Sequence, residues 1–333
     1  MVNLVEAQKP LLHGLMKLAG IKPHSIEIEP GTIMNFWVPS ETLIPKPKRN
    51  KKNTTTTTPC SYNQCSISPE STNKPNPNKP VLVLIHGFAG EGIVTWQFQV
   101  GALTKKYSVY VPDLLFFGGS ITDKPDRSPG FQAECLSKGL RKLGIDNCVV
   151  VGFSYGGMVA FKLAEMYPDL VEALVVSGSI LAMTDSISTT TLNGLGFSSS
   201  SELLLPTSVK GLKALLKVAA YKKLWFPDCL HRDFLEVMFT NRKERGELLE
   251  GLVVSNKETT IPNFPQRIHL LWGKEDQIFN LELAQNMKLQ LGEKTTFHGI
   301  DKAGHLVHLE RPCVYNKCLK QFLTSLHAEK NQK

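Results

Sequence analysis

The stretch Gly152-Phe153-Ser154-Tyr155-Gly156 decides the fold of this 333-residue chain. It follows the short apolar run 148–151 and opens a helical pattern that ends at Pro168. A Gly-x-Ser-x-Gly pentapeptide bends a strand sharply into a helix, and only small flanking residues permit that turn. The sequence therefore predicts that the Ser154 hydroxyl stands above the carboxyl end of a buried strand.

From residue 81 onward, short apolar runs alternate with helical stretches, which is typical of a parallel sheet covered by helices. Most of these runs are followed closely by Gly, Asp or Ser, as expected where buried strands meet functional loops. The alternation breaks between residues 181 and 265, where helical stretches occur without a convincing strand. We therefore expect a helical cap at 181–265, inserted between two strands. The strands expected in the sheet are 81–85, 109–112, 148–151, 173–177, 268–272 and 295–298.

Residues 1–45 are predicted to form an N-terminal helix and a β-hairpin of the core. The helix is expected from Leu11 to near Gly20, packed on the domain, because its polar face lacks the Lys and Arg cluster of membrane-surface helices. The hairpin strands 25–28 and 32–38 would turn at Pro30-Gly31 and form the antiparallel start of a mixed sheet.

Segment 46–80 is predicted to be a disordered linker insertion. Five consecutive threonines and repeated Pro and Asn give it too little apolar surface to fold alone. It holds seven Lys or Arg and one acid, so it accounts for six of the eight positive charges of the chain. Since the rest is nearly balanced, we expect no nucleic-acid-binding face.

The sequence also suggests where the protein works. No apolar run reaches the length of a membrane span, and the first twenty residues lack the apolar core and cleavage site of a signal peptide. Seven scattered cysteines, an odd number, favour reduced thiols and a cytoplasmic protein. No cysteine pair has zinc-knuckle spacing, so neither a metal nor another cofactor is expected.

A serine nucleophile needs a histidine base, itself oriented by a carboxylate. Asp276 follows the predicted strand 268–272, and His305 follows the last predicted strand. Glu275 is a rival for the acid and His308 for the base, but Gly304 gives His305 the turn position at a strand end. The predicted catalytic residues, in chain order, are Ser154, Asp276 and His305, an order that differs from the two well-known protease orders.

These motifs, with Leu84-Ile85-His86-Gly87-Phe88 and Glu310-Arg311-Pro312, make the chain resemble the α/β-hydrolase fold superfamily. More narrowly, it is similar to plant hydrolases related to monoacylglycerol lipases and to bacterial carbon–carbon bond hydrolases. The resemblance implies a mostly parallel eight-stranded sheet covered by helices, with a core of 81–180 and 266–333 and an inserted helical cap. It places the acid at Asp276, and it implies an oxyanion hole made by the backbone amides of Phe88 and Tyr155.

The walls of the binding pocket are predicted from the cap and from one turn of the core. The cap is rich in apolar and aromatic residues, which favours an acyl chain or an apolar ring over a charged metabolite. The turn that begins at Asp113 departs from the common Gly-x-Gly form of the family, and we interpret Asp113 as a residue that ties this loop. The candidate pocket residues are His86, Phe116, Phe117, Trp225, Phe226 and His308.

The predicted function is that of a serine hydrolase, which cleaves small to medium apolar or lipid-like carboxylic esters through an acyl-enzyme. Its expected partner is that ester alone, with the protein a monomer or weak dimer and weak contact with a membrane surface left open. Epoxide hydrolase and dehalogenase chemistry is disfavoured, because both need a carboxylate in place of Ser154. Two alternatives stay open: a carbon–carbon bond hydrolase of the ring-fission type, and a hormone-like small-molecule receptor on the same fold.

Overall fold

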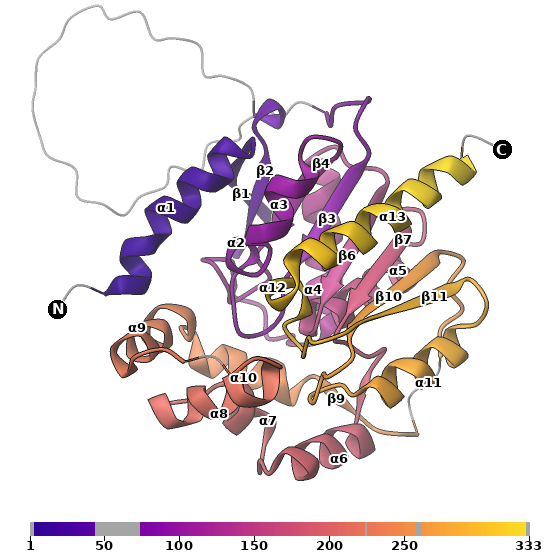
Figure 1. Ribbon diagram of the computed structural model, residues 1–333. Coiled ribbons are helices and arrows are strands. Elements are labelled where there is room, and N and C mark those ends of the chain that lie inside the picture. Colours follow the sequence, from indigo (N-terminus) through magenta and orange to yellow (C-terminus); the bar gives the residue numbers. More distant parts are fainter. Residues whose placement is uncertain (1–2, 44–73, 224, 258–260, 331–333) are drawn as a thin grey trace, which may run out of the picture.

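A single large sheet runs through the centre of the molecule, with helices on both faces (Figure 1). The computed structural model describes residues 3–43, 74–223, 225–257 and 261–330. The strands lie in the order β1-β2-β4-β3-β6-β7-β10-β11, and the short strand β5 pairs with β2. The sheet therefore has nine strands instead of the expected eight. Strand β5 was not predicted, because two residues are too few to show an alternation of apolar and polar side chains. The strands are β1 Ile21–Glu29, β2 Thr32–Pro39, β3 Val81–Ile85, β4 Ser108–Pro112, β5 Ile121–Thr122, β6 Cys148–Phe153, β7 Val171–Ser177, β10 Arg267–Gly273 and β11 Thr295–Ile300.

The sheet is antiparallel at one edge and parallel elsewhere. β2 pairs antiparallel with β1, β4 and β5, whereas the neighbours from β4 to β11 all run parallel. The hairpin and the six strands predicted after residue 80 are confirmed, those six with ends within two residues of the expected positions. Because parallel strands end at the same edge of a sheet, the loops after β3, β6, β7, β10 and β11 meet there.

Apolar side chains alternate along the strands and form one core cluster on each face of the sheet. In β3, Leu82 and Leu84 join one cluster, whereas Val83 and Ile85 join the other. Helices α1, α2, α3 and α13 cover the first face, and α4, α5 and α11 cover the second. The helices of the core are α1 Leu4–Leu18, η1 Ser40–Thr42, α2 Gly92–Thr95, α3 Gln97–Leu103, α4 Pro129–Lys142, α5 Tyr155–Met166, α11 Leu281–Leu291, α12 Val307–Glu310 and α13 Pro312–Lys330.

The N-terminal helix α1 is longer than the sequence indicated. It begins at Leu4 instead of Leu11 and contains Pro10. Its first turn is capped by Asn3, whose side chain accepts from the Glu6 amide, and it is held by Asp233 of the cap, which accepts from the Leu4 amide at 2.7 Å. The prediction was wrong about the start because a contact 229 residues away in the chain stabilises that turn.

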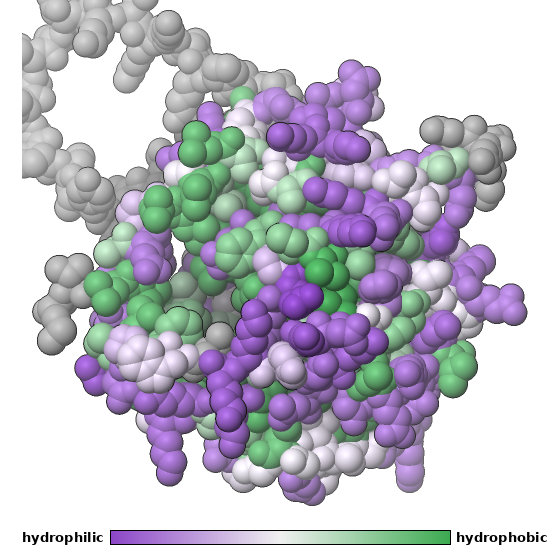
Figure 2. All heavy atoms as spheres, viewed as in Figure 1, coloured by the Kyte–Doolittle hydropathy of each residue, from purple (hydrophilic) through white to green (hydrophobic). Residues whose placement is uncertain are grey.

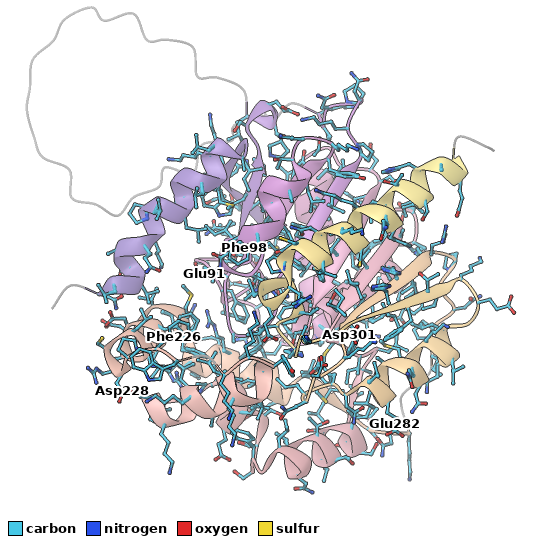
Figure 3. All side chains as sticks on the ribbon, viewed as in Figure 1. Glu91, Phe98, Phe226, Asp228, Glu282 and Asp301 are labelled. Carbon is cyan, nitrogen blue, oxygen red and sulfur yellow. The ribbon has the colours of Figure 1, made fainter. Side chains whose placement is uncertain are left out.

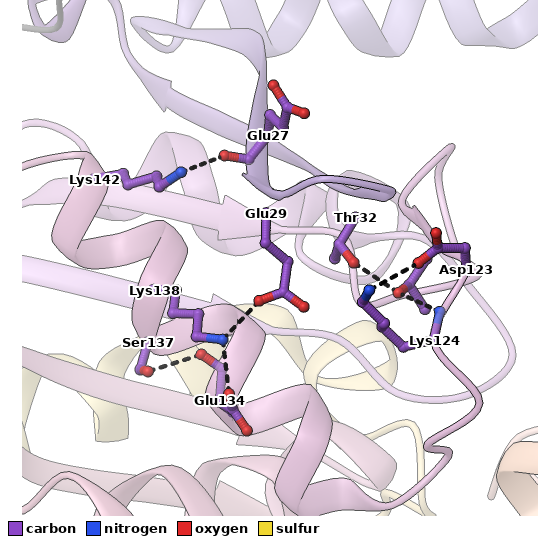
Figure 4. Close-up of polar contacts among 10 residues, drawn as sticks. Glu27, Glu29, Thr32, Asp123, Lys124, Glu134, Ser137, Lys138 and Lys142 are labelled. Carbon is purple, nitrogen blue, oxygen red and sulfur yellow. Dashed lines mark hydrogen bonds and ion pairs between the residues drawn. The ribbon is translucent and has the colours of Figure 1, made fainter.

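Polar contacts hold the β1–β2 hairpin against α4 (Figure 4). Lys138 lies 2.7 Å from Glu134 and 2.9 Å from Glu29, and these hydrogen bonds to carboxylates raise the pKa of the Lys138 ammonium. The same contact lowers the pKa of Glu29. On the other side of the hairpin, the hydroxyls of Thr32 and Thr122 lie 2.7 Å apart and join β2 to β5. The hairpin is therefore fixed as the antiparallel edge of the sheet.

The region between β7 and β10 is helical, but it also holds two short strands. Met183 and Thr184 of β8 pair in parallel with Val253 and Val254 of β9, so the expectation of a region without strands was wrong. Two-residue strands are set by tertiary pairing and leave no pattern in the sequence. The elements are β8 Met183–Thr184, α6 Asp185–Leu195, α7 Ser200–Leu204, α8 Val209–Ala219, α9 Asp228–Met238, α10 Arg242–Glu250 and β9 Val253–Val254.

Two further expectations concern the linker and membrane-spanning helices. Most of the predicted linker, residues 46–73, lies outside the described residues; 74–80 lead into β3. Among the helices that the structure describes, none combines the length and the apolar character needed to cross a membrane.

Candidate active site

Ser154 lies on a strained turn between β6 and α5. Its φ of 54° and ψ of −123° fall in a region that non-glycine residues rarely adopt. Close packing explains the flanking glycines. A Cβ on Gly152 would lie 2.7 Å from the Gly156 carbonyl oxygen, and one on Gly156 would lie 2.2 Å from the His86 carbonyl oxygen. The strained turn predicted from the pentapeptide is therefore present and is imposed by its surroundings.

The structure brings Ser154, His305 and Asp276 together. His305 Nε2 lies 3.0 Å from Ser154 Oγ, and His305 Nδ1 lies 2.9 Å from Asp276 Oδ2. The other carboxylate oxygen of Asp276 accepts from the amides of Ile278 and Phe279 at 2.9 and 3.0 Å. These hydrogen bonds offset the cost of burying the carboxylate. The arrangement lets the serine hydroxyl donate to a histidine whose other nitrogen is held by an acid.

Glu275, the rival for the acid, contacts main chain instead of His305. Its two carboxylate oxygens accept from the amides of Lys302 and Ala303 at 3.1 and 2.9 Å. It therefore holds the loop that leads to His305, and it is not positioned to orient the imidazole.

Glu310 holds the next amide of that loop and links the loop to the cap. It accepts from the Gly304 amide at 2.7 Å, and also from the amides of Tyr221 and Lys222 at 3.1 and 2.8 Å. A Cβ on Gly304 would lie 2.8 Å from the Tyr221 nitrogen, so the two segments are in close contact. Our interpretation of the sequence gave Glu310 no role of its own, because its partners are backbone amides, which any residue carries, and two of the three lie almost 90 residues away.

The loop after β3 lies against the serine. A Cβ on Gly87 would lie 3.2 Å from the Ser154 Cβ, and Phe88 and Tyr155 both line the cavity at Ser154. Among the described residues, neither the Phe88 nor the Tyr155 amide has an acceptor. Both amides are therefore free to bind a ligand oxygen.

His86 braces this loop from behind. Its Nε2 accepts from the Leu114 amide at 2.9 Å, so the proton is assigned to Nδ1, which donates to the Gly87 carbonyl oxygen at 2.7 Å. Burial lowers the pKa of His86 to about 4, which keeps the ring neutral. His86 was predicted to line the pocket, but it shapes the loop instead.

The cavity above Ser154 is narrow, with a volume of about 40 Å³. Ligand pockets usually have about 300–1,000 Å³. A wall must therefore shift before a substrate can bind. Most of the lining is apolar, and much of it belongs to the cap: Phe88, Ser154, Tyr155, Met158, Met183, Ser188, Thr191, Leu192, Ser200, Leu203, Leu204, Leu249, Leu252, Ile278, Phe279 and His305.

None of the six candidate pocket residues belongs to this lining. Phe116 and Phe117 are buried under guanidinium groups of Arg127 and Arg245, which lie 4.6 and 4.1 Å from the ring centroids. Arg245 also donates to the Phe116 carbonyl oxygen at 3.0 Å, so it ties the cap to this turn. The two phenylalanines are therefore part of the packing behind the site.

The prediction was also wrong for the other candidate pocket residues, which are His308, Trp225 and Phe226. His308 is fully buried beside the rings of Trp96 and Phe153, and burial lowers its pKa to about 3. Trp225 and Phe226 lie on the outside of the cap, with Trp225 84% exposed. The cavity-lining residues of α6 escaped the prediction because that helix is rich in Ser and Thr and has no clear apolar face.

A larger cavity, of about 650 Å³, lies between α6 and α11. It shares Thr191 and Ile278 with the cavity above Ser154, but Ser154 and His305 do not line it. Helix α6 lines both spaces and has no fully buried residue, and its Ile187, Leu192 and Leu195 pack against the core only partly buried. It is therefore the wall best placed to move.

Asp113 ties two loops together, as predicted. Its carboxylate accepts from the Gly92 amide at 2.7 Å, and a Cβ on Gly118 would lie 2.3 Å from it. Burial raises the pKa of Asp113 to about 8. In the part of the chain that the structure describes, no three His, Cys, Asp or Glu side chains gather as a metal site would require.

Comparisons with known proteins bear on the fold that carries this geometry. Residues 80–203 match the profile of a family described as having the alpha/beta hydrolase fold. Human epoxide hydrolase 4 is 24% identical, over 74% of this chain and 72% of its own. A 2-hydroxy-6-oxononadienedioate/2-hydroxy-6-oxononatrienedioate hydrolase from Pseudomonas sp is 26% identical (73% and 87%), and monoacylglycerol lipase ABHD6 from Bos taurus is 26% identical (77% and 79%).

The fold is also similar to that of solved structures. A putative lipase from Acinetobacter baumannii AYE superposes with a TM-score of 0.71 at 21% identity, over 96% of this chain and 97% of the other. The relatives share hydrolase chemistry, and the profile, the sheet and the turn at Ser154 agree. The chain has the α/β-hydrolase fold, and its similarity to these relatives supports a hydrolase.

Proposed function

We propose that the protein is a serine hydrolase of carboxylic esters, with Ser154 as nucleophile, His305 as general base and acid, and Asp276 as the group that orients the imidazole. The observation that carries this proposal is the pair of contacts at 3.0 and 2.9 Å that joins Ser154 to His305 and His305 to Asp276. Cytoplasmic location, plant origin and a role in lipid metabolism stay predictions.

The reaction follows from this geometry. Ser154 Oγ attacks the ester carbonyl carbon while its proton passes to His305 Nε2. The carbonyl oxygen becomes an oxyanion, and the amides of Phe88 and Tyr155 are placed to donate to it. His305 then gives the proton to the departing alcohol, which leaves an acyl ester on Ser154. Water attacks this ester by the same steps and releases the acid and the free serine.

The apolar lining of the cavity supports a neutral, apolar acyl group. Among the described residues that line it there is no Lys or Arg. Burying a charged substrate group without a partner is costly. The monoacylglycerol lipase relative fits this chemistry, and Ser154 in place of a carboxylate separates the chain from ester-forming epoxide hydrolases.

Carbon–carbon bond hydrolysis is the second candidate, because the Pseudomonas relative is as similar as the lipase. The substrate named for that relative is a dicarboxylate, and the lining here offers it no cation. We therefore rank ester cleavage first. Turnover of a vinylogous diketone, with negligible ester turnover, would reverse this ranking.

The test is active-site labelling by a fluorophosphonate probe, read by intact mass, with hydrolysis of p-nitrophenyl butyrate in parallel. We expect one adduct on the wild type, and loss of both adduct and turnover in Ser154→Ala. Ser188→Ala is the matched control, because Ser188 lines the same cavity but has no histidine partner among the described residues. A labelled and active Ser154→Ala would overturn the proposal. Absent labelling of folded wild type would favour the receptor alternative.

A further inference from the structure

The outer face of helix α1 is apolar. Four leucines of this helix are between 47 and 87% exposed: Leu4, Leu11, Leu15 and Leu18. Their spacings of seven, four and three residues place them within about 60° of one another on a helix of 3.6 residues per turn. Figure 2 shows hydrophobic, green side chains gathered over this part of the molecule. Single exposed leucines are ordinary, but a continuous row on one helix face calls for a partner.

The inner face of α1 is already satisfied. Met16 is buried, Val5 and Leu12 pack against the core, and His13 makes an edge-to-face contact with Trp37 at 4.9 Å. The helix is also fixed at its N-terminus by Asp233 of α9. The leucine row is therefore a rigid outward surface, and folding of the described chain does not cover it.

Two exposed aromatic residues of the cap lie in the segment that leads into α9, the helix against which α1 packs. α1 packs against α9, and Trp225 and Phe226 lie two or three residues before the first residue of α9. Figure 3 places Phe226 at α9, below the N-terminal end of α1. Both rings are exposed, with Trp225 at 84%. We call Leu4, Leu11, Leu15, Leu18, Trp225 and Phe226 the leucine–aromatic face.

We propose that the leucine–aromatic face binds the surface of a lipid bilayer. A row of Leu with a neighbouring Trp is the composition that inserts between lipid headgroups and acyl chains. Exposed Lys222 and Lys223 lie two or three residues before Trp225 and would meet anionic headgroups. Helix α1 packs on the domain, as expected, but it also presents a second, exposed apolar face that the sequence analysis did not predict.

A second copy of the chain is a poorer occupant. The leucine row, without the two aromatic residues, is about 22 Å long at 1.5 Å per residue and about 10 Å wide, the diameter of a helix, so it covers about 200 Å². A stable protein interface needs about 800 Å² per partner. A bilayer has no such requirement, because insertion depends only on apolar area and nearby charge.

The chain carries its own reporter for this binding. Of its four tryptophans, Trp37, Trp96 and Trp272 are buried, and Trp225 is exposed. Adding phosphatidylcholine vesicles to the full chain should shift the tryptophan emission to shorter wavelength, and lipids brominated in the acyl chain should quench it. Vesicles that also contain phosphatidylglycerol should bind more tightly. Trp225→Phe should bind with no shift of the remaining emission.

The leucines are tested by the triple variant Leu11→Gln, Leu15→Gln, Leu18→Gln, with vesicle flotation as the readout. Glutamine keeps helix propensity, so an unchanged circular dichroism spectrum and Tm are expected. The partition coefficient should fall at least about tenfold, as expected when several buried apolar side chains are lost. Leu289→Gln is the matched control, because Leu289 is 77% exposed on α11, away from α1.

Three results would overturn the proposal. They are no shift and no flotation with either vesicle, unchanged partition of the triple variant, and a wild-type dimer, measured by light scattering, that the triple variant converts to a monomer. The last would make the face a subunit interface. The inference does not rest on the proposed ester hydrolysis, since Ser154→Ala should bind vesicles as the wild type does.

Discussion

The loop that carries His305 and the helix α6 line the same small cavity but are held in different ways. In the loop, three successive amides, from Lys302 to Gly304, are bound by the carboxylates of Glu275 and Glu310. Helix α6 has no buried residue, and a Cβ on its Gly194 would meet nothing within 4 Å. The comparison teaches that chemistry and access make opposite demands. Reacting atoms need fixed positions, whereas a closed cavity needs one wall that can yield.

The largest effect on activity is expected at Asp276, the acid that binds His305. Asp276→Asn should lower kcat by about 10³ to 10⁴-fold, because the amide no longer holds the correct histidine tautomer. Glu275→Gln should cost about tenfold, since it loses one acceptor for a loop amide. Turnover of p-nitrophenyl butyrate by both folded variants is the measurement. Equal losses would mean that the acid is misassigned.

Two glycine substitutions compare the packing of the two sides directly. Gly156→Ala places a Cβ 2.2 Å from a carbonyl oxygen, so we expect a loss of at least about 3 kcal/mol in the free energy of unfolding. Gly194→Ala in α6 should be neutral or stabilising by up to about 1 kcal/mol, because alanine favours helix and meets no neighbour. Urea denaturation measures both. A destabilised Gly194→Ala would contradict a loosely held α6.

Glu310 connects the loop that carries His305 to the cap. Its substitution therefore tests whether the position of this loop depends on the cap. Glu310→Gln removes one acceptor oxygen from a side chain that binds three amides. Hydrogen bonds to charged groups contribute about 1.5–3 kcal/mol, so kcat should fall about tenfold with little change in KM. Glu293→Gln, an exposed substitution, is the control. A change in KM alone would place the effect of Glu310 in the cap.

The last effect is expected at Asp113, which lies outside both regions, and it concerns stability and its dependence on pH. Burial raises its pKa from 3.8 to about 8, so between these values the folded state holds a proton that the unfolded state releases. Stability from this group is therefore present at low pH and is lost as pH rises toward 8. Relative to Asp113→Asn, the wild type should lose about 3 to 4 kcal/mol between pH 5 and pH 8. Urea denaturation at both pH values is the measurement. A difference in the free energy of unfolding between the two proteins that is the same at pH 5 and pH 8 would refute this prediction.

Local sequence patterns were sufficient to predict the strands of the core. The errors of prediction arose where a structure depends on contacts between distant segments. The parallel strands are short apolar runs with turn residues after them, so their positions were predictable to within two residues. The start of α1, the strand pair β8–β9 and the wall formed by α6 were not. The first depends on Asp233 and the second on a partner 70 residues away. The α6 residues become lining only through their position over Ser154.

What the sequence by itself determined is the class of fold and the choice of Ser154, Asp276 and His305 as candidates, because a strained turn and strand-end residues have strong local preferences. Only the tertiary structure decided that these three lie within hydrogen-bond distance, that His86 and His308 are buried braces, and that α1 shows leucines outward. The reason is physical. Side-chain burial and hydrogen-bond partners are set by which elements pack together, and that information is spread over the whole chain.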